Sequence, residues 1–222
     1  PVCLRTRHDA LELQTPDVAR HIDQLVLRNP LELRELYRLS MEDILDYLQA
    51  LGEQLQIDRN RHLRQALDVV LNTSHQTLEM SLPVFRAIPG MFARDSVMEL
   101  VERNIGVASM EGWVTEKQSD RDVAVRAFGA RAVHVIAGNG PVVAAHTIIM
   151  NAVTRSDAII KLPSNDPCTA LAIVRTMVEM APDHPLTRHV SAAYWKGGDA
   201  RVESYLYDPK HIEKIVAWGG FN

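Results

Sequence analysis

The chain contains few cysteines and no long apolar run. Cys3 and Cys168 are the only thiols among 222 residues, which excludes a disulfide scaffold and a cysteine-rich zinc site and is typical of a reducing compartment such as the cytoplasm. No apolar run approaches the roughly 20 residues that a membrane-spanning helix needs. No signal peptide is visible at Pro1, although a start other than Met leaves the true N-terminus open.

A basic surplus is absent too. The chain has 24 Lys and Arg against 28 Asp and Glu, a formal net charge of −4, which offers no basic surface for nucleic acid or an anionic membrane. The histidines form no convincing ligand set, because His184 and His189 flank a proline-containing loop and do not share a helix face. We therefore expect no metal site.

Residues 1–105 are predicted to form an N-terminal helical segment laid on a larger body. The stretch "SMEDILDYLQALGEQL" places its apolar residues three or four apart on one face. Ser40 is suited to cap this helix, with Asp43 at the capping-box position. An earlier helix is predicted to start after Pro16 and to end before Asn29. The composition, 46% hydrophobic and 23% charged, is ordinary for a globular protein of one large or two small domains.

Residues 106–130 are predicted to form a β-hairpin. Within "GWVTEKQSDRDVAVRAFG", two short strand-like pieces, Trp113–Thr115 and Val123–Phe128, lie on either side of a polar turn. The register of the two pieces stays open.

Residues 131–222 alternate between strand and helix patterns with a step of roughly 30 residues, the size of a βαβ unit. The strand candidates are "RAVHVIAG", "AIIKLP", "HVSAAYW" and "IEKIVAWGG". The helix candidates are "PVVAAHTIIMNAV", "PCTALAIVRTMVEMA" and "DARVESYLY". Continuous apolar strands alternating with helices indicate an α/β fold with a Rossmann-type parallel sheet covered by helices on both faces. This sheet is expected to be incomplete, since a strand is followed by no helix before Asn222.

The four predicted strands end in "AGNGP", "KLPSNDP", "KGGD" and "WGGFN". Ligands of open α/β sheets gather at the carboxyl ends of the strands, glycines allow close approach, and helix N-termini favour phosphate. These ends therefore suggest a nucleotide site. The dinucleotide fingerprint G-x-G-x-x-G is absent, however, and turns of this composition follow strands in any α/β protein.

Four segments in order, "HVIAGNGPVVA", "AIIKLPSNDP", "VSAAYWKGGD" and "HIEKIVAWGG", resemble the long-chain acyl-CoA reductases of the bacterial bioluminescence family, within the aldehyde dehydrogenase superfamily. The N-terminal "LYRLSMEDILDYLQALGEQL" is similar as well. Each segment alone is modest, but four in the right order are specific. The resemblance implies an NADPH-dependent oxidoreductase that converts long-chain acyl-CoA, or another acyl thioester, to fatty aldehyde through an acyl-cysteine intermediate. Residues 131–222 would be the first part of its NADP(H)-binding domain.

The resemblance implies a catalytic role for Asn139. Its turn matches the one that supplies an amide to the oxyanion hole of the superfamily, where a rigid N–H donor stabilises the charge on the attacked carbonyl oxygen by about 3 kcal/mol. Without the resemblance, an asparagine at this position is explained by its tolerance of unusual turn dihedrals.

Lys161 and Ser164 are the implied contacts to the adenosine ribose. Related NAD-preferring enzymes carry a Glu in the turn after this strand, whereas the sequence here is "LPSND", which leaves room for a 2′-phosphate and favours NADPH. Asp166 argues against this preference unless it caps the helix that starts near Pro167. The remaining implied cofactor contacts are Gly197, Gly198, Trp218, Gly219 and Gly220.

The nucleophile implied by the resemblance is a cysteine beyond Asn222, in a catalytic domain that this chain does not contain, so this portion alone is expected to be inactive. Cys168 matches no family nucleophile, although a thiol in the first turn of a helix tends to have a lowered pKa. His134 is expected to be a buried histidine whose ring nitrogens are hydrogen-bonded. His146 is close to Asn139 in the sequence, and no role is assigned to it.

The family also implies partners: an acyl-transferase, an acyl-protein synthetase and a second copy of the chain, held through the 106–130 hairpin as an oligomerisation arm. Two other functions stay open. One is an NAD(P)-dependent aldehyde dehydrogenase working in the oxidising direction. The other is a non-catalytic nucleotide-binding or assembly module.

Overall fold

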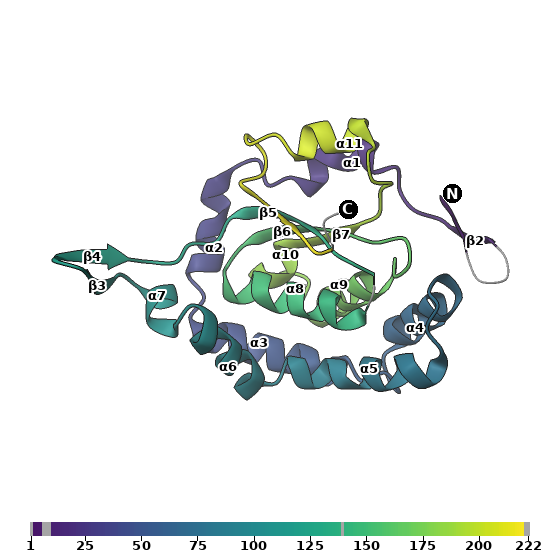
Figure 1. The fold of residues 1–222 in the computed structure, drawn as a ribbon, viewed down its shortest axis with the longest axis horizontal. Coiled ribbons are helices and arrows are strands. Elements are labelled where there is room, and N and C mark those ends of the chain that lie inside the picture. Colours follow the sequence, from purple (N-terminus) through teal and green to yellow (C-terminus); the bar gives the residue numbers. More distant parts are fainter. Residues whose placement is uncertain (1, 6–9, 139, 220–222) are drawn as a thin grey trace.

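A four-stranded parallel sheet forms the centre of the molecule (Figure 1). The structure, a computed structural model, describes residues 2–5, 10–138 and 140–219. The strand order is β7-β6-β5-β8. The strands are β5 (Arg131–Val135), β6 (Asp157–Lys161), β7 (Val190–Ala193) and β8 (Lys214–Ala217). All four predicted strands are present, and because they run parallel their carboxyl ends share one edge of the sheet.

Burial along the strands follows their place in the sheet. The central strands β5 and β6 are buried at all but their last residues, as expected for parallel strands covered on both faces. Strand β8, by contrast, is exposed at every residue. The prediction of an α/β fold with an incomplete parallel sheet is confirmed.

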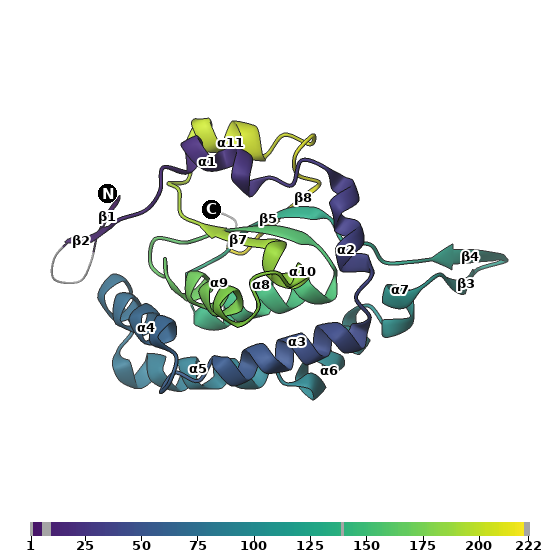
Figure 2. The same cartoon turned by 180° about the vertical axis from the view of Figure 1, so that it is seen from behind.

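Helices cover both faces of the sheet (Figure 2). On one face lie α8 (Pro141–Val153) and α9 (Thr169–Met180), and on the other α1 (Val18–Leu25) and α11 (Ala200–Leu206). The short α10 (Pro185–Arg188) precedes β7. The described strand-to-strand crossovers therefore agree with the predicted sequence of strands and helices.

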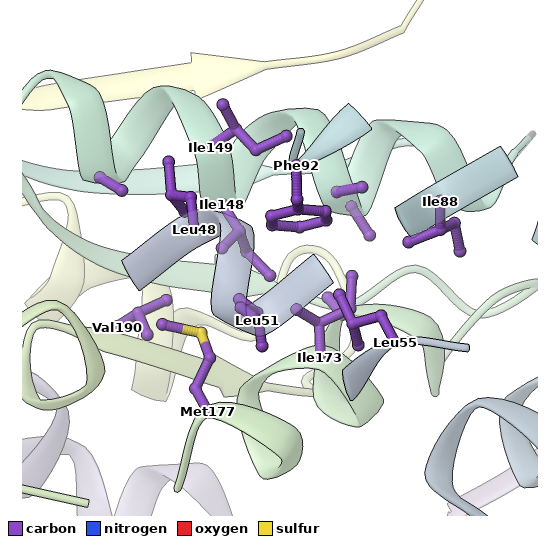
Figure 3. Packing of buried hydrophobic residues seen from close by; sticks show 14 of the residues in the cluster. Leu48, Leu51, Leu55, Ile88, Phe92, Ile148, Ile149, Ile173, Met177 and Val190 are labelled. Atoms are coloured by element: carbon purple, nitrogen blue, oxygen red, sulfur yellow. The ribbon is translucent and has the colours of Figure 1, made fainter. Parts of the chain in front are cut away.

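The segment η1 (Pro30–Leu33) and helix α2 (Arg34–Tyr37) lead along one side of the molecule from α1 to an outer layer of helices (Figures 1 and 2). This layer lies on the α8–α9 side and consists of α3 (Met41–Gln54), α4 (Arg61–Thr73), α5 (Leu78–Met91), α6 (Arg94–Asn104) and α7 (Val107–Glu111). One hydrophobic cluster runs from this layer through α8 and α9 to the sheet. Figure 3 shows Leu48 and Leu51 of α3 among Ile148 of α8 and Ile173 of α9.

Helix α3 matches its sequence pattern closely. The Ser40 side chain accepts from the backbone N–H of Asp43, and the Asp43 carboxylate accepts from the backbone N–H of Ser40, which confirms the predicted capping box. Its predicted apolar face, from Met41 to Leu55, is buried. Helix α9 packs against both α8 and α4, and it buries Ala170, Ile173 and Met177 while Val178 stays 48% exposed.

Two hairpins project from the body. The hairpin of β3 (Val114–Gln118) and β4 (Arg121–Val125) pairs Val114 with Val125 and extends well away from the sheet (Figure 1). The predicted hairpin is therefore present, with its second strand starting two residues earlier than Val123. The hairpin of β1 (Val2–Arg5) and β2 (Ala10–Leu13) lies in a region that was expected to be helical.

Arg155 attaches the outer helical layer to the sheet. It follows α8 with a left-handed φ of 54°, an uncommon conformation for a residue with a side chain, and is 3% exposed. Its guanidinium donates to the carbonyl oxygens of Leu39 (3.0 Å) and Met110 (3.1 Å) and to the Glu111 carboxylate (2.6 Å). Glu111 also accepts from the backbone N–H of Met41. One side chain thus joins three separate segments.

Only glycine fits at position 129, which lies against the backbone of Arg155. A Cβ on Gly129 would lie 2.1 Å from the Arg155 carbonyl oxygen. The Gly129 carbonyl oxygen in turn accepts from the Tyr37 hydroxyl at 3.1 Å, which ties α2 to the start of β5.

None of the helices among the described residues is long and apolar enough to cross a membrane.

His189 lies between two carboxylates at the end of the sheet opposite the turns discussed above. Its Nδ1 is 2.9 Å from Asp157 and its Nε2 is 2.8 Å from Glu35 of α2. Burial alone would lower the pKa of His189, but the hydrogen bonds and charges of Asp157 and Glu35 together outweigh it and raise the pKa. The charged imidazole therefore stabilises the folded chain.

We predict that this stabilisation is present below the ordinary histidine pKa of about 6.5 and is lost as pH rises through the higher folded-state pKa. The free energy of unfolding, measured by denaturant titration from about pH 6 to pH 9, should therefore fall with rising pH. His189→Gln should flatten this fall, whereas His21→Gln, a change on the exposed face of α1, should leave it intact. A slope that survives in His189→Gln would assign the pH dependence to another group.

Candidate functional site

A cavity of about 880 Å³ opens at the carboxyl ends of β6 and β7. Its walls come from the turn after β6, the turn after β7, α11 and the 15–18 segment before and at the start of α1. Three of the predicted cofactor residues, Lys161, Ser164 and Gly197, line this one cavity. Its volume lies within the range of cofactor sites, about 300–1,000 Å³.

Lys161 is the last residue of β6 and provides the cation at the base of the cavity. Its ammonium group lies 5.5 Å from the centre of the Trp195 ring, within the reach of a cation–π contact. Burial lowers the pKa of Lys161, and the Glu203 carboxylate opposes that shift. The described residues include no salt bridge to Lys161, so its charge is available to a ligand.

Glu203 of α11 fixes the turn after β7. Its carboxylate accepts from the Trp195 indole N–H at 3.3 Å and from the backbone N–H of Gly198 at 3.1 Å. Gly198 has a left-handed φ of +80°, which favours glycine at this position. Sequence reasoning missed both Trp195 and Glu203. One sequence signal was available. Glu203 lies four residues after Asp199, one turn into the predicted helix, so its carboxylate is on the same side of the helix as the turn.

The carboxylate of Asp166 points away from the cavity and into the start of α9. It is buried and accepts from the backbone N–H (3.0 Å) and hydroxyl (2.7 Å) of Thr169. Burial raises the pKa of Asp166, partly offset by these hydrogen bonds. Asp166 therefore accepts hydrogen bonds from the first residue of α9, as its expected role at this helix start requires, although the N-cap position itself is Cys168. The turn at 162–165 presents no carboxylate to the cavity.

The other carboxylates of the cavity, Asp17 and Asp199, are paired with arginines, Arg20 lying 3.5 Å from Asp17. Arg201 donates to both carboxylate oxygens of Asp199, at 3.1 and 2.7 Å, and lies 4.0 Å from Asp17. Lys196 adds a further cation to the lining. A ligand that carries negative charge would meet Lys161 and Lys196 without displacing a salt bridge among the described residues.

Asn139 and Gly220, both predicted site residues, lie outside the described residues. The flanking Gly138 is described, and a Cβ on it would lie 1.8 Å from the Asn165 amide oxygen. The turn after β5 and the turn after β6 are therefore in direct contact. This close approach explains why a glycine stands at position 138.

Trp218 and Gly219 follow β8, on the opposite side of β5 from the large cavity. The Trp218 backbone N–H donates to the Val135 carbonyl oxygen at 2.9 Å, and its ring meets His146 edge-on at 5.6 Å between centres. Trp218 lines a second cavity, and Gly198 and Gly219 line neither. The structure thus gathers part of the predicted cofactor set and places the rest further along the same sheet edge.

The second cavity, of about 280 Å³, lies between α8, β5 and β8. Three buried polar atoms of its lining have no hydrogen-bond partner among the described residues: His134 Nδ1, Thr147 Oγ1 and Asn151 Oδ1. An unpaired buried polar group costs about 1–3 kcal/mol. Burial also lowers the pKa of His134, which keeps its ring neutral. The expectation that His134 is a satisfied core histidine is wrong for Nδ1.

The described residues contain no group of three or more His, Cys, Asp or Glu side chains that could hold a metal ion. His184 instead accepts from the backbone N–H of Leu186 at 3.2 Å and stacks on Tyr47, with ring centres 4.3 Å apart. His62, on α4, faces Glu179 at 2.9 Å.

A family model described as acyl-CoA reductase (LuxC) matches residues 36–222. Among curated proteins, the long-chain acyl-protein thioester reductase of Photorhabdus laumondii is 26% identical over 200 residues, covering 87% of this chain and 40% of that protein. The protein of the same name from Vibrio harveyi is 25% identical over 188 residues, covering 82% and 38%. The chain therefore spans about two fifths of the length of the curated relatives it matches.

Solved structures show the same fold. Glyceraldehyde-3-phosphate dehydrogenase GapN from Methanocaldococcus jannaschii, complexed with NADP, aligns with a TM-score of 0.60 at 11% identity over 97% of this chain and 49% of that one. An NAD-dependent benzaldehyde dehydrogenase from Corynebacterium glutamicum aligns with a TM-score of 0.62 at 11% identity over 97% and 48%. The expected aldehyde-dehydrogenase-like fold is confirmed.

Cys168 lies at the start of α9 in a third, mainly apolar cavity. Burial, together with the nearby Asp166 carboxylate, raises the pKa of its thiol to about 11, so burial outweighs the effect of the helix N-terminus that sequence reasoning considered.

We predict that Cys168 resists alkylation in the folded chain. In a Cys3→Ser background, iodoacetamide at pH 8 should modify Cys168 at least about a hundredfold more slowly than it modifies the denatured chain, because the thiolate is the reacting form. Mass spectrometry of timed samples gives both rates. Equal rates in the folded and denatured chain would show an activated thiol and reopen a chemical role for Cys168.

Proposed function

Since the chain belongs to the acyl-CoA reductase (LuxC) family, we propose that it is the NADPH-binding portion of a reductase that converts long-chain acyl-CoA or another acyl thioester to a fatty aldehyde. The observation that carries the cofactor assignment is the cavity of about 880 Å³ with unpaired Lys161 at the carboxyl end of β6. The names of the relatives favour the reducing direction over the oxidation of aldehydes.

The residues around Lys161 fit the adenosine end of a dinucleotide. The Lys161 ammonium and the Ser164 hydroxyl are both able to donate to ribose oxygens or to a phosphate. Nothing within 4 Å would meet a Cβ on Gly197, so a ligand can approach this backbone closely. The Trp195 ring is almost fully buried, and the Lys161 ammonium lies 5.5 Å from its centre.

The charges of the cavity support NADPH over NADH. A ribose 2′-phosphate adds negative charge, which a cation binds and a carboxylate repels. The turn at 162–165 offers a hydroxyl and an amide, Asp166 is turned into α9, and Asp199 is held by Arg201. Lys161 and Lys196 therefore face this position without a free carboxylate beside them.

The proposed reaction has two steps, and this chain contributes the Asn139 amide to both. A cysteine thiolate, in the part of the longer relatives that this chain does not span, attacks the thioester carbonyl carbon, and the carrier thiol leaves. NADPH, when bound, supplies the hydride that adds to the acyl carbon; the bond to the cysteine then breaks, which releases the aldehyde and restores the thiolate. In both steps the Asn139 amide N–H donates to the negative carbonyl oxygen.

We further propose that the hairpin of β3 and β4 binds a second copy of the chain. It stands clear of the body, and Trp113 and Phe128 at its base are 65% and 53% exposed.

An acyl-transferase and an acyl-protein synthetase are proposed as partners in the cytoplasm, because the relatives are named for acyl groups carried on a protein.

Ser164→Glu tests the cofactor assignment. A carboxylate at position 164 should repel a 2′-phosphate and accept from the ribose hydroxyls of NADH, so the ratio of NADPH to NADH affinity should fall by roughly 10- to 100-fold. Nicotinamide fluorescence titration measures both dissociation constants. The matched control is Ser204→Glu on the exposed side of α11, which should change neither. An unaltered ratio in Ser164→Glu would remove the 2′-phosphate from this turn.

Asn139→Ala tests the catalytic assignment in the full-length reductase. Because the amide is proposed to act on the oxyanion alone, kcat should fall by about a hundredfold while the dissociation constant of NADPH stays within about twofold. Stopped-flow measurement of aldehyde formation and a fluorescence titration give the two values. A parallel loss of turnover and NADPH affinity would mean that Asn139 supports the turn and has no direct part in the reaction.

A further inference from the structure

The lining residues of the second cavity include several with a buried polar atom that has no hydrogen-bond partner among the described residues. His134 on β5 and Thr147 and Asn151 on α8 are each at least nine-tenths buried, and each contributes a polar atom that no described residue pairs. Thr147 and Asn151 are one helical turn apart and so point to the same side of α8. Buried polar groups in folded proteins are almost always hydrogen-bonded, so these three atoms indicate a missing occupant.

The three atoms define the chemistry of that occupant. Asn151 Oδ1 only accepts, since its Nδ2 already donates to the Ser156 carbonyl oxygen, so the occupant must donate a hydrogen there. The Thr147 hydroxyl and the neutral His134 ring can each donate or accept. The described lining presents no carboxylate, and much of it is apolar, including Met150 and Val216. Its one Lys or Arg, Lys214, is exposed. The occupant is therefore not a cation; it is largely apolar and carries both a donor and an acceptor.

The position of the cavity relates it to the proposed reaction. It runs along β5 from Ala130 to His134, a distance of about 13 Å, and ends near the Trp218–His146 contact. Helix α8, which forms one wall, begins at Pro141, directly after the turn that contains Asn139. An extended molecule in this cavity would therefore reach toward that turn.

We propose that this cavity binds the pantetheine arm of the thioester substrate, with an amide N–H of the arm donating to Asn151 Oδ1 and an amide carbonyl oxygen of the arm accepting from the Thr147 hydroxyl and from His134 Nδ1. This inference rests on the proposed function, and it names the part of the substrate that this chain recognises. An alkyl chain could fill the cavity but would leave all three polar atoms unpaired. A secondary amide between methylene groups satisfies them and matches the apolar lining.

The direct test is the binding of pantetheine to the 222-residue chain by isothermal titration calorimetry, with the wild type and Thr147→Val. The substitution keeps the shape of the side chain and removes a hydroxyl that has no partner in the described structure. It should therefore leave the melting temperature of the free chain unchanged or higher, and weaken pantetheine about tenfold.

Thr176→Val on α9 is the matched control. The Thr176 hydroxyl is also buried but donates to the Ala172 carbonyl oxygen at 2.8 Å and accepts from Asn60 at 2.9 Å. Its removal should lower the melting temperature and leave pantetheine affinity unchanged. If Thr147→Val failed to fold, Asn151→Asp would serve, because it retains an acceptor but changes its charge; it should alter the pH dependence of pantetheine binding.

Two further ligands test whether the cavity binds a peptide carrier or an acyl chain in place of pantetheine. N-acetylcysteine methylamide represents a peptide carrier, and tetradecanol represents an acyl chain. Weak binding of both, with Thr147-dependent binding of pantetheine, supports the proposal. Equal or tighter binding of the peptide analogue, tighter binding of tetradecanol to Thr147→Val than to wild type, or no pantetheine binding would each overturn it.

NADPH titration of the same samples keeps the two hypotheses apart. Retained NADPH binding with no pantetheine binding would reject this inference and leave the proposed function in place. Loss of NADPH binding by the wild-type chain would reject the proposed function itself.

Discussion

The guanidinium of Arg155 holds the layers of this protein together. It is buried, it donates to carbonyl oxygens of two separate segments, Leu39 and Met110, and it forms an ion pair with Glu111. Its backbone adopts a left-handed conformation at the end of α8, which brings the next residues into β6. Breaking a buried pair of this kind by removing one partner is typically costly, because it leaves the other groups unpaired. The bonds of Arg155 therefore join the helical layer, α8 and the sheet, and they fix the position of α8.

That fixed position sets one wall of the smaller cavity. One face of α8 packs into the continuous core with Ile148 and Ile149, while the side carrying Thr147 and Asn151 lines the smaller cavity. At the same edge of the sheet, Gly138 and Asn165 bring the turns after β5 and β6 together. Glu203 fixes the turn after β7 and thereby places Trp195 beneath Lys161. The proposed cofactor site, at the ends of β6 and β7, and the proposed pantetheine site, between α8, β5 and β8, share no lining residue.

Much of the fold could be predicted from the sequence, because local patterns determine it. The capping box at Ser40, the apolar face of α3 and the alternation of strands and helices after Arg131 each depend on neighbouring residues. The remaining features depend on contacts between distant residues. The role of Glu203, the unpaired Nδ1 of His134 and the raised pKa of the Cys168 thiol follow from burial and from neighbours that the sequence does not place side by side. The hairpin of β1 and β2 was missed because its short strands carry no strong alternation.

The most direct measurement of the central claim is a crystal structure of the chain with NADPH. We predict that the adenosine lies in the cavity beyond β6 and β7, with its 2′-phosphate within hydrogen-bond distance of Lys161 Nζ and the Ser164 hydroxyl. The ribose should lie against the backbone of Gly197. An adenosine bound elsewhere on the chain, or a 2′-phosphate directed into solvent away from Lys161, would contradict it.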